Sequence, residues 1–211
     1  MKKKDIDIYQ SADKAIKTMN RDIIRDFGTL KTAKYDELNI IQSVTQLYRR
    51  QQEKARRRYY EVAFEGYLIG MYLVGMSGKK AQEMAEKAIT PEWIERLLTE
   101  VDPVTMYRFD TETERKAQRL AEILSASPTP SREIDRAAVI WSKQTGQYAI
   151  NATDEAIKQA YIDAGVEMVM WVTARDERVC DECGPRDGKV YSIDEVPPKP
   201  HWGCRCVLLP V

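Results

Sequence analysis

The first half of the chain places apolar residues at the spacing of an amphipathic helix. From residue 36 to about residue 76, apolar or small side chains recur at steps of three, four or seven residues: Ile41, Val44, Tyr48, Ala55, Tyr59, Val62, Gly66, Ile69 and Leu73. This is the period of one face of an α-helix. The pattern predicts one long helix of about 60 Å at 1.5 Å per residue, with a bend or break near residues 75–78.

Two glycines lie on the same face of this predicted helix. Gly66 and Gly70 are four residues apart, and each lowers helix propensity by about 1 kcal/mol relative to alanine. Without side chains, they would let another backbone approach closely. We therefore expect tight packing at this face to offset the cost of the glycines.

The rest of the first 125 residues also carries signals for helices. Thr90 precedes Pro91, which is typical of a capping hydroxyl followed by a first-turn proline. Thr111 and Glu114 have the spacing of a capping box. Prolines and serines between residues 125 and 131 then predict a linker. Beyond it, residues 131–164 predict one or two helices, interrupted near Gly146.

The last part of the chain changes to an extended pattern. Residues 166–173 and 189–193 favour short strands, and Asp187-Gly188 is typical of a hairpin turn. The predicted fold class is α+β: a mainly helical N-terminal region with a long amphipathic helix, then a small C-terminal α+β module with a β-hairpin segment closed by cysteines and histidine. The predicted domains are a helical arm or bundle (1–125), a linker (126–131) and a C-terminal domain (132–211).

Charge and hydropathy exclude some classes of protein. The 33 basic residues balance 33 acidic ones, so no overall charge favours nucleic acid or a membrane surface. The longest apolar stretch, residues 62–76, contains Glu65 and is shorter than the roughly 20 residues of a membrane span. The N-terminal lysines precede no apolar run, so we expect no secretory signal. Four cysteines without such a signal indicate a reducing compartment, where thiols more often bind metal.

Every cysteine and the only histidine lie between residues 180 and 206. Two residues separate Cys180 from Cys183, and two separate His201 from Cys204, which is a two-knuckle zinc pattern. If the tail is extended, Cys206 lies on the same face as Cys204 and either completes the shell. The prediction is a zinc ion that staples the C-terminal segment, held by four of the five residues Cys180, Cys183, His201, Cys204 and Cys206.

Three alternatives to zinc stay open at this point. Cys180 or Cys183 could form a disulfide with Cys204 or Cys206, or the four thiols could be reduced and packed. A catalytic cysteine–histidine pair fits less well, because nothing in the sequence marks an oxyanion hole. We therefore predict no enzyme and no catalytic residue.

An ordered series of motifs resembles a known family. A strand that contains a tryptophan comes first, followed by a cysteine knuckle, an Asp-Gly turn and a terminal His-x-x-Cys-x-Cys. The residues of the series are Gly165-Val166, Trp171-Val172-Thr173, Asp176-Glu177-Arg178-Val179-Cys180, Cys183, Asp187-Gly188-Lys189 and His201 to Cys206. This series, over about residues 135–211, is similar to the C-terminal domain of phage head morphogenesis proteins, minor capsid proteins similar to phage Mu protein F. Many relatives carry Arg-Thr-Glu on the preceding helix, where this chain reads Lys143-Gln144-Thr145, so no role tied to that motif is transferred.

The resemblance implies a virion component made in the host cytoplasm. Such proteins enter the prohead in a few copies, lie at the portal vertex or capsid interior, and contact portal, capsid or scaffold proteins. In some phages they bind double-stranded DNA and influence its delivery. The implied function is assistance in head assembly, without a small-molecule substrate. The alternatives are a non-specific DNA-binding zinc module acting in packaging or ejection, and a thiol-dependent enzyme.

Basic residues cluster on the long predicted helix, opposite its apolar stripe. Only Glu53 offsets six cations: Arg49, Arg50, Lys54, Arg56, Arg57 and Arg58. One interpretation is a solvated face, which is the usual one for helices. The other is contact with DNA phosphates or with an acidic portal surface, which would make binding fall steeply with salt.

Overall fold

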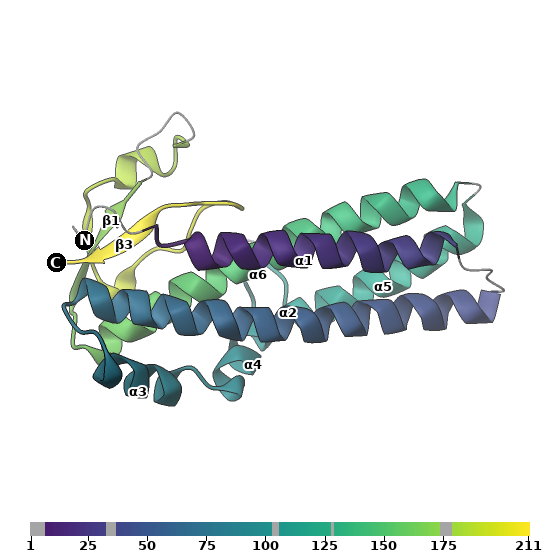
Figure 1. The fold of residues 1–211 in the computed structure, drawn as a ribbon. Coiled ribbons are helices and arrows are strands. Elements are labelled where there is room, and N and C mark those ends of the chain that lie inside the picture. The colour runs from purple at the N-terminus through teal and green to yellow at the C-terminus, as the bar shows by residue number, and fades with distance from the viewer. Residues whose placement is uncertain (1–6, 33–36, 103–105, 128, 174–178) are drawn as a thin grey trace.

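The computed structural model describes the chain except residues 1–6, 33–36, 103–105, 128 and 174–178 (Figure 1). Six α-helices lead into a small sheet within the described residues. The helices are α1 (Gln10–Gly28), α2 (Glu37–Leu73), α3 (Lys79–Ala88), α4 (Pro91–Thr99), α5 (Phe109–Ala126) and α6 (Pro130–Asp163). The strands are β1 (Met168–Val172), β2 (Val190–Ser192) and β3 (Val207–Pro210). The predicted α+β class is confirmed.

The long helices form a bundle, and the sheet lies at one end of it (Figure 1). Helices α1, α2, α5 and α6 share one hydrophobic core. Its centre is aromatic: the Phe109 ring is stacked on Trp141 and lies edge-on to Tyr59 and Tyr148. Such pairs add to the stabilisation that their buried area provides. None of the described helices combines the length and apolarity needed to cross a membrane.

Helix α2 confirms the long helix that the apolar spacing predicts. It ends at Leu73, and Gly75 and Gly78 follow with φ angles of +89° and +72°, a conformation that favours glycine. The prediction that Ile41 lies on the apolar stripe is wrong: Ile41 is 57% exposed, whereas Ile40 is 5% exposed. Neighbouring helical residues point about 100° apart, so only one of the two faces the core.

The two glycines of α2 bring α6 into close contact, as the sequence predicts. A Cβ atom on Gly66 would lie 2.8 Å from the Thr153 carbonyl oxygen. One on Gly70 would lie 2.7 Å from the Ala160 Cβ and 3.0 Å from the Ile157 carbonyl oxygen. The backbones of α2 and α6 therefore approach more closely than any larger residue at these positions allows.

The predicted starts and breaks of the other helices are partly confirmed. Thr90 caps α4 and accepts a hydrogen bond from the Trp93 N–H at 3.2 Å. The capping box at Thr111 is wrong: α5 begins at Phe109, whose full burial draws the chain into the core earlier. The interruption at Gly146 is also wrong. Helix α6 continues through this residue, because Gly146 is buried against Ile16 of α1 and the packing maintains the helix.

The predicted linker falls in the short connection between α5 and α6. Helix α5 ends at Ala126 and α6 begins at Pro130, so little more than a turn separates them. Both helices contribute to the same core. The division of the chain into two domains at this point stays a prediction.

The sheet has the strand order β2-β1-β3, with both pairs antiparallel. The central strand β1 alternates, and Val169 and Trp171 face inward. Val169 packs with Ile8, Tyr9 and Ile193 in a second core cluster. Trp171 packs with Cys183, Cys204 and Cys206 in a third. Strand β3, which the sequence patterns leave unpredicted, completes the sheet and positions the cysteines just before it.

Candidate metal centre

A tight turn after β1 carries the first two candidate ligands. The backbone N–H groups of Cys183 and Gly184 both donate to the Cys180 carbonyl oxygen, at 3.1 and 2.9 Å. The Cys183 N–H also lies 3.3 Å from the Cys180 sulfur. Desolvation opposes ionisation of Cys180, but hydrogen bonds to its sulfur, first of all from the Cys183 N–H, lower the pKa of its thiol overall. The turn is thus a knuckle that favours a thiolate, the form that binds metal.

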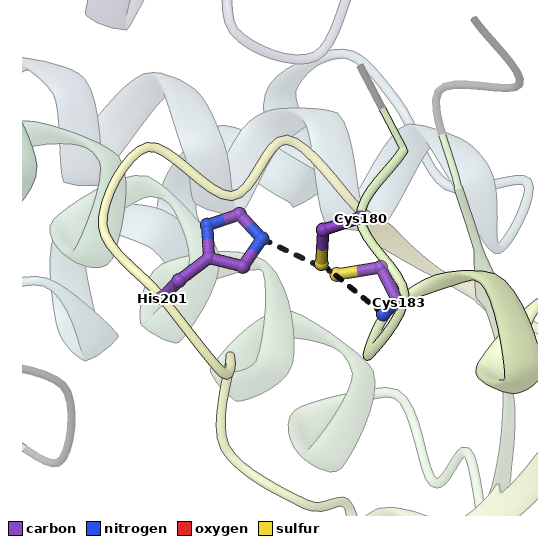
Figure 2. Close-up of side chains that lie close together, drawn as sticks. All are labelled: Cys180, Cys183 and His201. Carbon is purple, nitrogen blue, oxygen red and sulfur yellow. Dashed lines mark hydrogen bonds between the residues drawn. The ribbon is translucent and has the colours of Figure 1, made fainter. Parts of the chain in front are cut away.

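The segment before β3 brings the other three candidates to this knuckle, and Figure 2 shows the His201 ring pointing toward the two cysteines of the turn. The Cys183 sulfur lies 3.6 Å from His201 Nε2 and 3.7 Å from the Cys204 sulfur. Ligand atoms within 4.8 Å of one another form two triads, Cys180-Cys183-His201 and Cys183-Cys204-Cys206. Cys183 belongs to both triads. The structure therefore gathers all five residues that the sequence singles out.

Two distances in this cluster match those expected between neighbouring ligands of a tetrahedral zinc ion. Zinc–sulfur bonds of about 2.3 Å and zinc–nitrogen bonds of about 2.0 Å place neighbouring ligand atoms roughly 3.8 Å (S–S) and 3.6 Å (S–N) apart. The two contacts of Cys183 have these lengths. A disulfide would instead hold two sulfurs about 2.05 Å apart, and all four cysteines are free. The donor atoms and these two spacings therefore suit a metal ion such as zinc.

The orientation of His201 also suits a metal ligand. Its Nδ1 atom lies 2.9 Å from the Trp202 carbonyl oxygen. A carbonyl only accepts, so Nδ1 carries the proton and Nε2 presents its lone pair toward Cys183. This backbone hydrogen bond is the main reason that the pKa of His201 is raised. Metal-bound histidines are commonly fixed by such a hydrogen bond from the second ring nitrogen.

The thiols nearest β3 share their protons unequally. A hydrogen bond from the Cys206 thiol lowers the pKa of Cys204 to about 5, and the same bond raises the pKa of Cys206. Desolvation raises the pKa of Cys183 to about 12. Cys204 is thus held as a thiolate by protons on its neighbours. A metal ion would supply the positive charge that these protons supply here, and its binding would release them.

The cations predicted on α2 divide into two groups. Half are paired with acids of this chain: Lys54 with Asp26, Arg56 with Glu95 and Asp110, and Arg58 with Glu61. The other three, Arg49, Arg50 and Arg57, are exposed and have no ion pair to any residue that the structure describes. The acidic partners lie on other helices or one turn further along α2. The count of charges around residues 49–58, in which only Glu53 is acidic, therefore did not include them.

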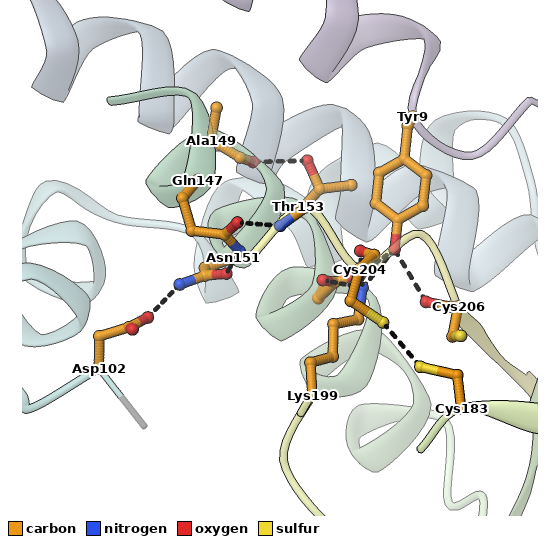
Figure 3. A network of polar contacts seen from close by, with 12 residues as sticks. Tyr9, Asp102, Gln147, Ala149, Asn151, Thr153, Cys183, Lys199, Cys204 and Cys206 are labelled. Atoms are coloured by element: carbon orange, nitrogen blue, oxygen red, sulfur yellow. Dashed lines mark hydrogen bonds and ion pairs between the residues drawn. The ribbon is translucent and has the colours of Figure 1, made fainter. Parts of the chain in front are cut away.

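The sequence reasoning missed the residues that hold the Cys/His segment against the helices. Gln147 accepts a hydrogen bond from the Gly203 N–H at 2.7 Å and donates to Asn151, whose side chain bonds Asp102. Tyr9, Asp154 and Lys199 form a second group of contacts; Figure 3 labels Tyr9 and Lys199 of this group. These residues come from the N-cap of α1, from α6 and from loops far apart in the chain. No motif joins them, so no spacing could have revealed them.

Comparison with known proteins gives one match. A family model described as phage Mu protein F like protein matches residues 76–209. The match covers more than half of the chain and includes α3 to α6, the sheet and all five candidate ligands. Neither a curated protein nor a solved structure matches the chain. Asp176, which the resemblance also uses, lies outside the described residues.

Proposed function

Since the chain belongs to the phage Mu protein F like family, a family of phage head morphogenesis proteins, we propose that it is a minor capsid protein of a tailed phage. It enters the prohead in a few copies near the portal, contacts portal, capsid or scaffold proteins, and assists assembly. The observation that carries this proposal is the family match across the C-terminal two-thirds of the chain. The role is one of structure and assembly, without catalysis, in the host cytoplasm and then in the virion.

The Cys/His centre serves this role as a structural zinc site. Cys180, Cys183, His201 and Cys204 are the proposed ligands, with Cys206 in reserve. Zinc would hold the knuckle against the segment before β3, where the third cluster offers few large apolar side chains. Small modules of this kind gain much of their stability from a metal.

Purified proheads and virions are expected to contain the protein at a small fraction of the abundance of the major capsid protein. Quantitative mass spectrometry of gradient-purified particles measures this ratio, with free tails from the same lysate as the control. A minor capsid protein is found in both head preparations and is depleted from the tails. Absence from proheads and virions would contradict the proposal, as would an abundance equal to that of the major capsid protein.

A second candidate function is contact with DNA during packaging or ejection. The observation that favours it is the group of unpaired cations Arg49, Arg50 and Arg57 on α2. A cation that already pairs with an acid must break that ion pair before it can neutralise a phosphate. An unpaired cation can neutralise a phosphate without losing a partner. The proposed phosphate contacts are therefore these three, and the paired Lys54, Arg56 and Arg58 contribute less.

Replacing Arg49, Arg50 and Arg57 with alanine is expected to weaken binding to nonspecific duplex DNA and to flatten its salt dependence. Each phosphate contact contributes about 0.9 to the slope of log K against log salt, so three lost contacts reduce it by roughly 2.7. Fluorescence anisotropy across a salt series measures the slope.

The matched control removes the same charge from another helix. Lys79, Lys80 and Lys87 on α3 are also exposed, and their alanine variants should keep the slope of the parent. Equal slopes for the parent and the α2 variant would eliminate this face as the phosphate contact.

A further inference from the structure

The segment that carries the last three candidate ligands also holds the start of α1. The Lys199 ammonium lies 2.5 Å from Asp154 Oδ2 on α6 and 2.6 Å from the Tyr9 hydroxyl, just before α1. That hydroxyl donates to the other Asp154 oxygen at 2.6 Å. One ammonium, one carboxylate and one phenol thus join the C-terminal segment to two helices.

Arg205 also contacts Tyr9. Its guanidinium donates to both carboxylate oxygens of Asp13 on α1, each at 3.2 Å. The same group lies 4.6 Å from the centre of the Tyr9 ring. A two-bonded arginine–carboxylate pair and a cation–π contact are both directional. The Tyr9 side chain, only 3% exposed, therefore contacts both Arg205 and Lys199. We call Lys199, Arg205, Tyr9, Asp13 and Asp154 the α1 clamp.

Clamp residues and candidate ligands are interspersed along the segment from Lys199 to Cys206. The Cys204 carbonyl oxygen accepts from Lys199 at 3.3 Å, and the Cys206 carbonyl oxygen lies 3.1 Å from the Tyr9 hydroxyl. The ligands thus send their sulfur atoms to the metal centre and their backbone oxygens to the clamp. The same backbone angles place the sulfur atoms at the metal centre and the carbonyl oxygens at the clamp. A rearrangement of the segment at the metal centre therefore also disturbs the clamp, and the reverse holds too.

We propose that metal binding at the Cys/His centre and docking of the first turns of α1 are thermodynamically linked. Zinc orders the 199–206 segment, and the ordered segment holds Tyr9 and Asp13. Loss of zinc releases the start of α1 from the C-terminal module, while the rest of the bundle stays folded. The inference concerns the isolated chain and is independent of any role in a phage head.

The linkage acts equally in both directions. If zinc strengthens docking of α1 by some factor, then docking strengthens zinc affinity by the same factor, typically about 5- to 150-fold for coupled sites. Asp13 provides a test of the second direction, the effect of docking on zinc affinity. Of the contacts described for its side chain, those with the Arg205 guanidinium join it to the segment. Its carboxylate is on α1 and is no candidate ligand.

Hydrogen exchange of the whole protein, with zinc and after chelation, measures the first direction. Chelation is expected to speed exchange of the amides of residues 10–15 at least tenfold. Amides of residues 23–27, at the far end of α1, should change less than twofold, and re-added zinc should restore protection. Unchanged exchange in residues 10–15 would overturn the linkage. So would an equal rise along all helices, because zinc would then support the whole fold rather than the clamp.

Zinc affinity, measured by competition with a chromophoric chelator, tests the second direction. Asp13→Asn is expected to weaken affinity at least fivefold, and Tyr9→Phe, which removes the shared hydroxyl, should weaken it similarly. The control Asp22→Asn lies on the same helix and pairs with Arg25, outside the clamp, so its affinity should stay within twofold of the parent. Parent-like affinity in both clamp variants would contradict the proposal, as would a parent protein that binds no zinc.

Discussion

Replacing Cys183 with serine is expected to abolish stoichiometric zinc binding and to destabilise the protein more than any other single cysteine change. Cys183 lies 3.6 and 3.7 Å from His201 and Cys204 and, among the described residues, it alone belongs to both ligand triads. Structural zinc contributes about 10–16 kcal/mol of apparent binding free energy in small modules. Loss of even a third of this would make the C-terminal module unfold before the helical bundle, with its own transition lowered by at least about 10 °C.

The serine variant of Cys206 is the matched control for this prediction. It has the same chemistry and lies in the same buried cluster, but it is the reserve ligand in the proposed set. Metal analysis and thermal unfolding of both variants, purified under reducing conditions, should give about one zinc per chain for Cys206→Ser and none for Cys183→Ser. If the two variants behaved alike, the proposed set of ligands would be wrong.

Replacing Gly70 with alanine is expected to destabilise the bundle, although alanine is the better helix former. The new Cβ would lie 2.7 Å from the Ala160 Cβ and 3.0 Å from a backbone oxygen. Overpacking costs about 1–3 kcal/mol, which exceeds the gain in helix propensity of about 1 kcal/mol. Urea unfolding should show a lower midpoint and an unchanged m-value.

Two further variants separate crowding from helix propensity. Gly28→Ala places a Cβ in open space at the end of α1, so it should leave stability unchanged or raise it by up to about 1 kcal/mol. Ala160→Gly removes the atom that the new methyl group meets, so it should cost less in the Gly70→Ala background than in the parent. A Gly70→Ala protein as stable as Gly28→Ala would disprove the close approach.

Local patterns predicted most of the secondary structure, and they failed where packing overrode them. Apolar spacing predicted α2, since a single face of that helix is buried along most of its length. The same reasoning placed a break at Gly146, where contact with Ile16 of α1 maintains the helix instead. It also started α5 too late, because burial of Phe109 was invisible in the local sequence. Propensity is a weak force, and a buried side chain outweighs it.

The candidate site was predictable because its residues are both rare and close in sequence. Five side chains with an affinity for metal, all within one short segment, already imply a shared environment. The basic face was less predictable. Charges that look free in the sequence are neutralised by partners distant along the chain, such as Asp26 for Lys54 and Asp110 for Arg56.

The sequence by itself determined the long helix, the close approach at two glycines, the five candidate ligands and the family resemblance. Each of these depends on residues near one another in the chain, where periodicity and spacing carry the information. Only the tertiary structure decided that Cys183 is shared by both triads, that three of the six cations on α2 are paired, and that Lys199 and Arg205 hold the start of α1. Those contacts join segments far apart in the sequence. They exist only because burial of the common core brings α1, α6 and the C-terminal segment together.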